Sequence, residues 1–236
     1  MKTKGILMLA IAGVLLQSCS RDVYNNNTYI ASNATAGHTV AILPVEVDLT
    51  GRLPKGYTRE NELRDEENES IAIQNMIYSE YLFKAKSTNK KKASVKLMNT
   101  ELVNSKLKEN GINTRQSWEM NPDSLGKLLG ADLVLKIRVQ KRRVMSETAS
   151  LGIGVATTVL DRVLDKSTGS SNSTLINTGA KTYSIVLNGT LSDVKTHTVV
   201  SKITKEQDAD WKRSPEEVLK STSAKLVRKG AVYAQQ

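Results

Sequence analysis

The sequence contains few of the residues from which metal and catalytic sites are usually built. Its 236 residues include one cysteine, Cys19, and two histidines, His38 and His197. One cysteine excludes an intramolecular disulfide, and two distant histidines do not have the spacing of metal ligands. No nucleophile, base and orienting residue can be assembled from the sequence. We therefore expect a non-enzymatic protein with no metal or cofactor, in which both histidines are exposed polar residues.

Aromatic residues are also scarce, at 4%, but the other proportions are those of a globular protein. Hydrophobic residues make up 39% of the chain and charged residues 25%, which is too apolar for wholesale disorder. The formal net charge is +10. A basic protein of this kind has affinity for polyanions, and its compartment decides which polyanions it meets.

Residues 1–18 have the pattern of a secretory signal peptide. Lys2 and Lys4 make its start positively charged, residues 5–16 are an apolar run, and Ser18 is a small residue before a cleavage point. The apolar run is too short to span a membrane as a permanent helix. The sequence therefore predicts an exported protein, for which nucleic acid is not an available partner.

Residues 16–19, Leu-Gln-Ser-Cys, resemble a lipobox, the site at which bacteria attach a diacylglycerol to a cysteine and then cleave before it. Cys19 would then be the acylated first residue of the mature chain. The alternative is a signal peptide in which Cys19 is incidental. Two acyl chains are enough for stable anchoring, so we expect a protein tethered to a membrane of the bacterial envelope, where phospholipid head groups are the available polyanions.

The first half of the remaining chain alternates strand and helix signals. Residues 19–37 are rich in Asn, Ser and Thr and predict a flexible tether. Residues 39–49 predict a strand that bulges or lies at a sheet edge, because Pro44 cannot donate to a ladder. The acidic run 60–69 leads into a helix whose apolar face has helical spacing. That face comprises Ile71, Ile73, Met76, Ile77, Tyr81 and Leu82.

Capping residues mark the later helices. Residues 93–98 predict a short strand, Asn99 or Thr100 begins a helix that ends at Gly111, and Asn121 begins another that ends at Gly130. A third helix begins with Ser214-Pro215-Glu216-Glu217, which has the spacing of a capping box. Asp132 follows Gly130, and we expect its carboxylate to cap backbone amides.

Two segments predict long strands. Residues 131–145 alternate between apolar residues and the polar residues Lys136, Arg138 and Gln140, which predicts one buried and one wet face. Residues 182–194 alternate similarly and are followed by a turn near His197 and a returning strand, which predicts a hairpin. The order of elements favours a single α/β domain over residues 38–236, built as a two-layer sandwich with a mixed sheet and interrupted by an insertion at 146–181.

The order of elements also resembles a family of bacterial envelope lipoproteins. The resemblance rests on residues 40–44 (VAILP), on Ile73-Gln74, on residues 104–111, and on residues 128–132 (LLGAD). The family includes the periplasmic domain of the curli secretion channel and an activator of penicillin-binding proteins. It implies a fold like anticodon-binding domains and the N-terminal domain of TolB, used for protein contacts. Residues 20–22 (Ser-Arg-Asp) are compatible with sorting to the outer membrane, so we expect a location there, facing the periplasm.

The insertion at 146–181 leaves alternatives open. Residues 151–155 alternate as a strand does, but Val155, Val159 and Leu160 begin an apolar series at helical spacing. A membrane-crossing hairpin needs about 9–11 alternating residues per strand and a matching partner. We find no such partner in the sequence. An amphipathic helix on the sheet or at the membrane interface therefore fits better than a hairpin of an oligomeric pore.

Two basic clusters are candidates for contact with anionic surfaces. They are Lys90, Lys91 and Lys92, and Lys141, Arg142 and Arg143; the alternative is that both are solubilising surface. We predict a non-enzymatic lipoprotein, anchored through Cys19, that serves as a protein-interaction or accessory module and binds another envelope protein. The alternative is a subunit of an oligomeric outer-membrane secretion pore.

Overall fold

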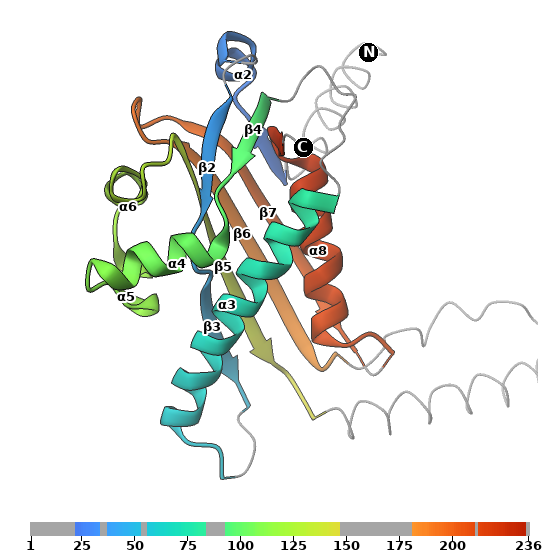
Figure 1. Cartoon of the computed structure of the whole chain (residues 1–236). Coiled ribbons are helices and arrows are strands. Elements are labelled where there is room, and N and C mark those ends of the chain that lie inside the picture. Colours follow the sequence, from blue (N-terminus) through green and yellow to red (C-terminus); the bar gives the residue numbers. More distant parts are fainter. Residues whose placement is uncertain are drawn as a thin grey trace, which may run out of the picture.

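A computed structural model describes residues 22–33, 37–52, 56–83, 93–146, 181–210 and 212–234. Within these residues, a curled mixed sheet of eight strands carries helices (Figure 1). The order along the sheet is β1-β7-β6-β5-β2-β4-β8, with β3 pairing to β5 beyond the end of β2. The strands are β1 (Val23–Asn25), β2 (His38–Ile42), β3 (Glu46–Gly51), β4 (Ala93–Leu97), β5 (Leu133–Arg143), β6 (Tyr183–Asp193), β7 (Val199–Ala209) and β8 (Val232–Ala234).

Strand β5 is the centre of the sheet and confirms the prediction of one buried and one polar face. Leu133, Leu135, Ile137 and Val139 are at most 3% exposed and belong to one core cluster. On the opposite face, Lys136 donates to the main-chain oxygens of Trp118 and Met120. The predicted hairpin is also confirmed, because β6 and β7 pair antiparallel from Tyr183 to Ser192.

Pro44 interrupts the strand predicted over residues 39–49. The chain leaves strand geometry at residues 43–45, and β2 and β3 pair separately with β5 on either side of this break. From Ile42 opposite Leu135 to Glu46 opposite Arg138, the chain at Pro44 advances four residues while β5 advances three, which agrees with the predicted bulge. Strand β2 is not at an edge, because β4 and β5 flank it. On the side of β4, the last residues of β2 have no neighbouring strand, because β4 ends at Leu97.

Gln74 fills this gap from helix α3 (Arg59–Phe83). Its side chain is fully buried, and Nε2 donates to the main-chain oxygen of Ile42 at 2.7 Å. The same amide exchanges two hydrogen bonds with the side chain of Asn104 in helix α4 (Thr100–Glu109). One amide therefore joins the broken end of β2 to two helices.

Replacing Gln74 with leucine is expected to lower the free energy of unfolding by about 3 kcal/mol, because the Ile42 carbonyl and the Asn104 amide lose buried partners. Urea denaturation followed by circular dichroism measures the change. Asn68→Leu is the matched control, because it places the same side chain at an exposed position of the same helix. Equal midpoints for the two variants would contradict the role given to Gln74.

Helices α3 and α8 (Pro215–Lys229) cover one face of the sheet. They enclose the larger core with β5, β6 and β7 (Figure 1). Ile73, Ile77 and Tyr81 of α3 are buried as the helical spacing predicted, but Leu82 is 41% exposed. The predicted capping box of α8 is present, with Ser214 and Glu217 exchanging hydrogen bonds with each other's backbone amides.

Helices α4, α5 (Thr114–Glu119) and α6 (Pro122–Leu129) lie on the other side of β2 and β5. Ala41, Leu43 and Val134 alternate with the residues of the larger core, so they point to the opposite face. There they join Val103 and Leu107 of α4 in a second core, with Leu125 and Leu129 of α6. The prediction of two layers is therefore wrong, because helices pack on both faces. The mixed α/β sheet itself is confirmed.

The predicted caps of α4 and α6 are both confirmed. Asn99 and Asn121 accept hydrogen bonds from the amides of Glu101 and Asp123. Gly130 ends α6 with a φ of 73°, a left-handed conformation that favours glycine. Asp132 accepts a 2.8 Å hydrogen bond from the amide of Thr39, so its predicted capping role is confirmed.

The prediction of a flexible tether over residues 19–37 is wrong for residues 23–33. Strand β1 pairs antiparallel with β7, from Val23 opposite Ile203 to Asn25 opposite Ser201. Helix α2 (Asn27–Asn33) follows and inserts Ile30, 4% exposed, into the larger core. Val23 and Tyr29 also pack against that core, while the polar residues of β1 pair with β7 through their backbone, so composition alone did not reveal this segment. No helix in the described ranges is long and apolar enough to cross a membrane.

Candidate functional site

A concave surface lies between α3 and α8, at the end of the sheet where β5 ends and β6 begins. Two adjoining pockets of about 210 and 470 Å³ share Glu69, Lys141 and Tyr183. We call this surface the α3–α8 groove. Its other lining residues are Leu49, Thr50, Tyr57, Asp65, Ala72, Ile73, Met76, Arg143, Ser214, Pro215, Glu216 and Leu219.

Lys141 of β5 is at the centre of the groove. Its Nζ lies 2.6 Å from Oε1 of Glu69 on α3 and 5.3 Å from the centre of the Tyr183 ring on β6. Opposite charge and the aromatic face both stabilise an ammonium at this position. The second oxygen of Glu69, Oε2, is buried and has no hydrogen-bond partner among the described residues. The groove therefore has a buried carboxylate oxygen without a partner among the described residues beside a paired cation.

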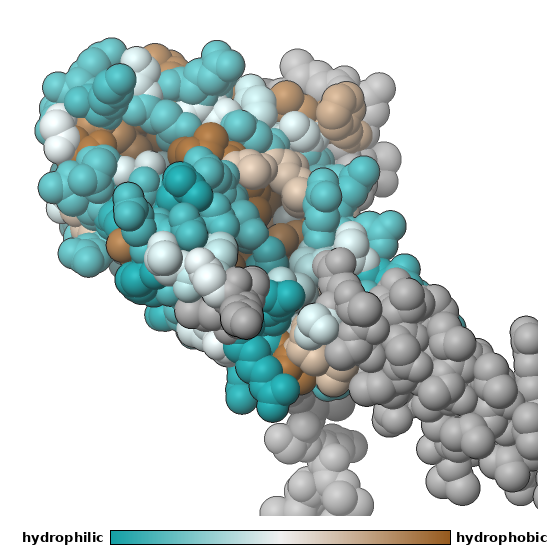
Figure 2. Space-filling model, turned by 90° about the horizontal axis from the view of Figure 1, so that it is seen from below, coloured by the Kyte–Doolittle hydropathy of each residue, from teal (hydrophilic) through white to brown (hydrophobic). Residues whose placement is uncertain are grey.

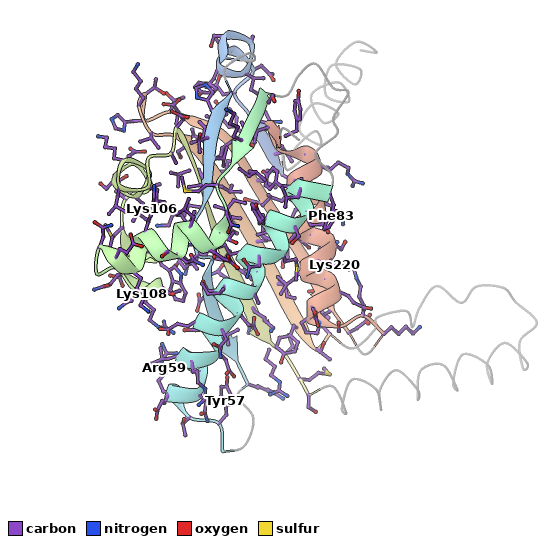
Figure 3. The ribbon with its side chains drawn as sticks, in the orientation of Figure 1. Tyr57, Arg59, Phe83, Lys106, Lys108 and Lys220 are labelled. Carbon is purple, nitrogen blue, oxygen red and sulfur yellow. The ribbon has the colours of Figure 1, made fainter. Side chains whose placement is uncertain are left out.

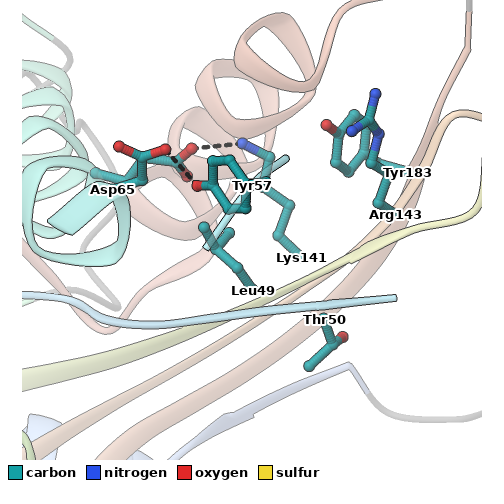
Figure 4. Close-up of a pocket in the computed structure, with 8 residues that line it drawn as sticks. Leu49, Thr50, Tyr57, Asp65, Lys141, Arg143 and Tyr183 are labelled. Atoms are coloured by element: carbon teal, nitrogen blue, oxygen red, sulfur yellow. Dashed lines mark hydrogen bonds and ion pairs between the residues drawn. The ribbon is translucent and has the colours of Figure 1, made fainter. Parts of the chain in front are cut away.

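Tyr57 and Asp65 form the polar wall of the smaller pocket. The Tyr57 hydroxyl donates to Oδ2 of Asp65, and Figure 4 shows this pair on the α3 side of Lys141. Burial and this hydrogen bond raise the pKa of Tyr57 to about 12. Tyr57 therefore remains protonated at neutral pH and acts as a donor, not as a base.

The apolar part of the groove is formed by side chains that extend the larger core to the surface. Ile73 is buried, Met76 is partly buried, and Leu219 approaches from α8. Viewed from this end, the surface is mainly hydrophilic with small hydrophobic areas between the polar ones (Figure 2). Such a combination suits binding of another protein, because apolar side chains supply burial and the polar groups fix orientation.

The predicted basic cluster at residues 141–143 does not form one surface. Alternation along β5 sends Lys141 and Arg143 into the groove and Arg142 to the opposite, exposed side. Lys141 is 13% exposed at its side chain and is paired with Glu69. The cluster at Lys90 to Lys92, the insertion between residues 147 and 180, and Cys19 lie outside the described residues.

Both histidines were predicted to be exposed polar residues; His197 is exposed, at 56% of its side chain, whereas His38 is only partly exposed. His197 lies in the β6–β7 turn with a φ of 57°, and its Nδ1 is 2.6 Å from Oδ2 of Asp123. The contact joins the turn to the start of α6. His38 is partly buried in β2, and its Nε2 has no hydrogen-bond partner among the described residues. It borders a separate pocket of about 650 Å³.

The polar residues of this separate pocket are explained by the turn that they hold. Tyr29 of α2 donates to Oδ2 of Asp193 at 2.5 Å, and Oδ1 accepts from the amide and hydroxyl of Thr196. Burial raises the pKa of Tyr29 well above its usual range, and the hydrogen bond to Asp193 raises it further. Burial alone would raise the pKa of Asp193, but the bonds from Tyr29 and Thr196 outweigh it and lower that pKa.

The central polar groups of the groove are engaged with neighbouring side chains. Lys141 is held in an ion pair with Glu69, and Tyr57 is held as a donor to Asp65. Among the described residues, no group of three or more His, Cys, Asp or Glu could hold a metal ion. The groove could not be predicted from the sequence because its residues come from β3, α3, β5, β6 and α8, which are far apart in the chain.

No protein-family model matches the sequence, and a search of curated proteins finds no match. The structure resembles the lipoprotein GNA1162 from Neisseria meningitidis, at 11% identity and a TM-score of 0.43, over 81% of this chain and 94% of that one. It also resembles the PelC dodecamer from Paraburkholderia phytofirmans, at 13% identity and a TM-score of 0.42, over 86% and 91% of the two chains.

A third similar structure is the LpoB C-terminal domain from Escherichia coli, at 13% identity and a TM-score of 0.30, over 77% and 96% of the two chains. The resemblance to bacterial envelope lipoproteins predicted from the sequence is thus found in the structure as well. At these identities and TM-scores it describes the path of the chain and says nothing of what the chain binds.

Proposed function

We propose that this chain is a non-enzymatic lipoprotein of the bacterial envelope, anchored through Cys19 at the outer membrane and facing the periplasm, whose α3–α8 groove binds another envelope protein. The lipobox-like residues 16–19 support the anchor. The proposed binding function rests on the surroundings of the two carboxylate oxygens of Glu69. One of its oxygens is paired with Lys141, while the other is buried in the groove without a partner among the described residues.

A buried acceptor of this kind costs free energy until a donor reaches it. The main-chain amides of an extended protein segment supply such donors in a row, and side chains between them can contact the apolar wall at Met76 and Leu219. Arg143 and Glu216 at the rim give charges of both signs with which a partner's side chains can pair. The groove therefore combines contacts for backbone, apolar and charged groups of a peptide segment.

The ion pair provides a test that separates binding from folding. Reversing it by Glu69→Lys together with Lys141→Glu keeps opposite charges adjacent but replaces the free carboxylate oxygen at position 69 with an ammonium. We expect the urea midpoint to change little and partner binding to fall at least about tenfold, which corresponds to 1.4 kcal/mol. Photocrosslinking in intact cells from position 216, followed by mass spectrometry, measures the binding.

The control places the same photocrosslinker at Glu109, an exposed acidic residue at the end of α4. Binding in the groove is supported by a discrete protein that crosslinks from position 216 and not from position 109. The same crosslink must be lost in the variant with the reversed ion pair. The proposal is wrong if crosslinks from position 216 persist unchanged in the reversed variant, or if positions 216 and 109 give the same products.

The alternative, a subunit of an oligomeric secretion pore, depends on residues 147–180, which are outside the described residues. It remains a prediction from the sequence, as does the assignment to an anticodon-binding or TolB-like fold. The size of the native protein extracted in detergent tests the pore: a stable ring would support it, and a monomer would contradict it.

A further inference from the structure

We infer that the sheet edge formed by β1, together with the adjoining end of α8, lies directly against anionic phospholipid head groups. We call this surface the β1 edge; it comprises Asp22, Lys205, Lys225 and Lys229. The inference rests on the proposed acylation of Cys19 and adds to it an orientation of the whole domain. It replaces the flexible tether predicted from the sequence with a short attachment.

The distance available between anchor and domain is small. Asp22 accepts a hydrogen bond through its main-chain oxygen from the amide of Thr204, and Val23 is paired with Ile203 in the sheet. Only three residue steps separate Asp22 from Cys19. Even a fully extended chain spans at most about 11 Å in three steps. An acylated Cys19 therefore holds the start of β1 close to the head groups.

Positive charge is concentrated at this point of attachment. Burial lowers the pKa of Lys205, and the nearby ammonium groups of Lys229 and Lys225 lower it further, which places the three cations together. Asp22 contacts Nζ of Lys205. Among the described residues, no carboxylate forms an ion pair with Lys225 or Lys229. Two cations of α8 thus remain available for an external anion.

The β1 edge and the lysines belong to one rigid surface. Nδ2 of Asn25 in β1 donates to the main-chain oxygen of Lys229 at 3.2 Å, which ties the strand to the last residue of α8. Lys225 and Lys229 are four residues apart and share one side of the helix, with Ser221 one turn earlier. An anionic surface near β1 is therefore also near both lysines.

An exposed aromatic side chain lies at the same end of the helix pair. Phe83, the last residue of α3, is 89% exposed, and Figure 3 shows it beside α8. Two residues earlier, the hydroxyl of Tyr81 is 3.6 Å from the position that a Cβ on Gly230 would occupy, so the ends of α3 and α8 are adjacent. Apolar side chains such as phenylalanine partition into the membrane interface, so an exposed Phe83 at this end of the helices suits contact with the membrane.

The short attachment also decides between possible anions. An acylated Cys19 keeps the head groups of the anchoring membrane within about 11 Å of the start of β1, a distance comparable to the Debye length of about 8 Å at physiological salt, whereas a soluble anion must be recruited from solution. Each lysine near an anionic surface contributes a factor of about five to the binding equilibrium. Phospholipid is therefore the occupant to which we commit.

The test uses the full-length protein, purified from membranes with its native N-terminus and reconstituted in phosphatidylcholine vesicles with and without phosphatidylglycerol. A fluorophore is attached at Ser221→Cys on α8, or at the matched control Ser124→Cys, an exposed serine of α6 on the other side of the sheet. Quenching by nitroxide-labelled head groups reports which residue is near the lipid. We expect strong quenching at position 221 and weak quenching at position 124.

Charge dependence is tested in the Ser221→Cys background. Lys225→Glu with Lys229→Glu is expected to reduce the quenching to the control level in vesicles that contain phosphatidylglycerol. The matched reversal Lys108→Glu with Lys195→Glu changes the net charge equally at exposed residues elsewhere and is expected to leave quenching unchanged.

The mass of the N-terminal peptide separates this inference from the proposed function. If Cys19 carries no acyl chains, the proposed anchor is wrong and the inference falls with it. If Cys19 is acylated but positions 221 and 124 are quenched equally, or quenching at 221 survives the reversal of Lys225 and Lys229, the inference alone is overturned.

Discussion

Replacing Arg115 with alanine is expected to lower the free energy of unfolding by about 3–5 kcal/mol, because it leaves a buried carboxylate without its counter-ion. That carboxylate is Glu66 on α3, whose side chain is 5% exposed. Its Oε2 lies 2.7 Å from a guanidinium nitrogen of Arg115, and its Oε1 accepts from the amide of Leu49 at 3.1 Å. Charge and hydrogen bonds at this point join α5, α3 and β3.

Arg115 makes further contacts that the variant would lose. Its guanidinium donates to the main-chain oxygen of Leu63 at 2.7 Å, pairs with Glu67 at 2.8 Å, and lies 4.9 Å from the centre of the Trp118 ring. The pair with Glu67 is partly exposed and adds little by itself. The expected loss is dominated by Glu66, because an unpaired buried charge cannot be compensated by water.

Urea denaturation of the full chain, followed by circular dichroism, measures this effect. Arg64→Ala is the matched control, because it removes the same type of side chain from an exposed position of α3. Among the described residues, Arg64 bonds only Asn61. Its expected change is within about 0.5 kcal/mol. The double variant Glu66→Gln with Arg115→Met should recover much of the loss, since it removes both charges. Equal effects of Arg115→Ala and Arg64→Ala would refute the assignment.

Replacing Cys19 with alanine is expected to move the protein from the membrane fraction to the soluble fraction almost completely. Two acyl chains give stable anchoring, whereas a single short contact surface does not. Cell fractionation with a wash in 1 M salt measures the shift, because this salt shortens the Debye length to about 3 Å and suppresses binding through lysines. The urea midpoint should remain that of the unaltered chain.

Ser20→Ala is the control for this variant, because it alters the next residue and leaves the thiol in place. It is expected to remain in the membrane fraction. Retention of Cys19→Ala after the salt wash, with the residues before position 19 removed, would show that another element anchors the protein. Release only in high salt would instead attribute the remaining attachment to charged residues such as Lys225 and Lys229.

Features determined by neighbouring residues were predictable from the sequence. Asn121 followed by proline, and Ser214 with Glu217 three residues later, specify helix starts through bonds within one turn. Alternation along residues 133–143 specified a strand with two different faces, because that pattern needs no knowledge of the partner strands. The hairpin of β6 and β7 follows for the same reason.

Features that depend on distant partners were not predictable in this way. In the sequence, Gln74 is simply a polar residue of a predicted helix. In the structure, its Nε2 lies 2.7 Å from the main-chain oxygen of Ile42, next to the break at Pro44. In the sequence, Glu66 is one residue of the acidic run 60–69, and only the folded chain places Arg115 of α5 against it. Strand β1 is short and polar. The residues that could have indicated buried structure in this segment are Val23 and Tyr24 in the strand and Ile30 in the helix that follows. The groove likewise requires five elements to meet, β3, α3, β5, β6 and α8.

The direction of α8 sets the distance between the two surfaces that we assign. Pro215 at its first residue lines the α3–α8 groove, and Lys229 at its last residue belongs to the β1 edge. Fourteen residue steps of an α-helix rise about 21 Å. The two surfaces thus lie at opposite ends of α8, about 21 Å apart along its axis, so a partner can occupy the groove while the β1 edge contacts the head groups.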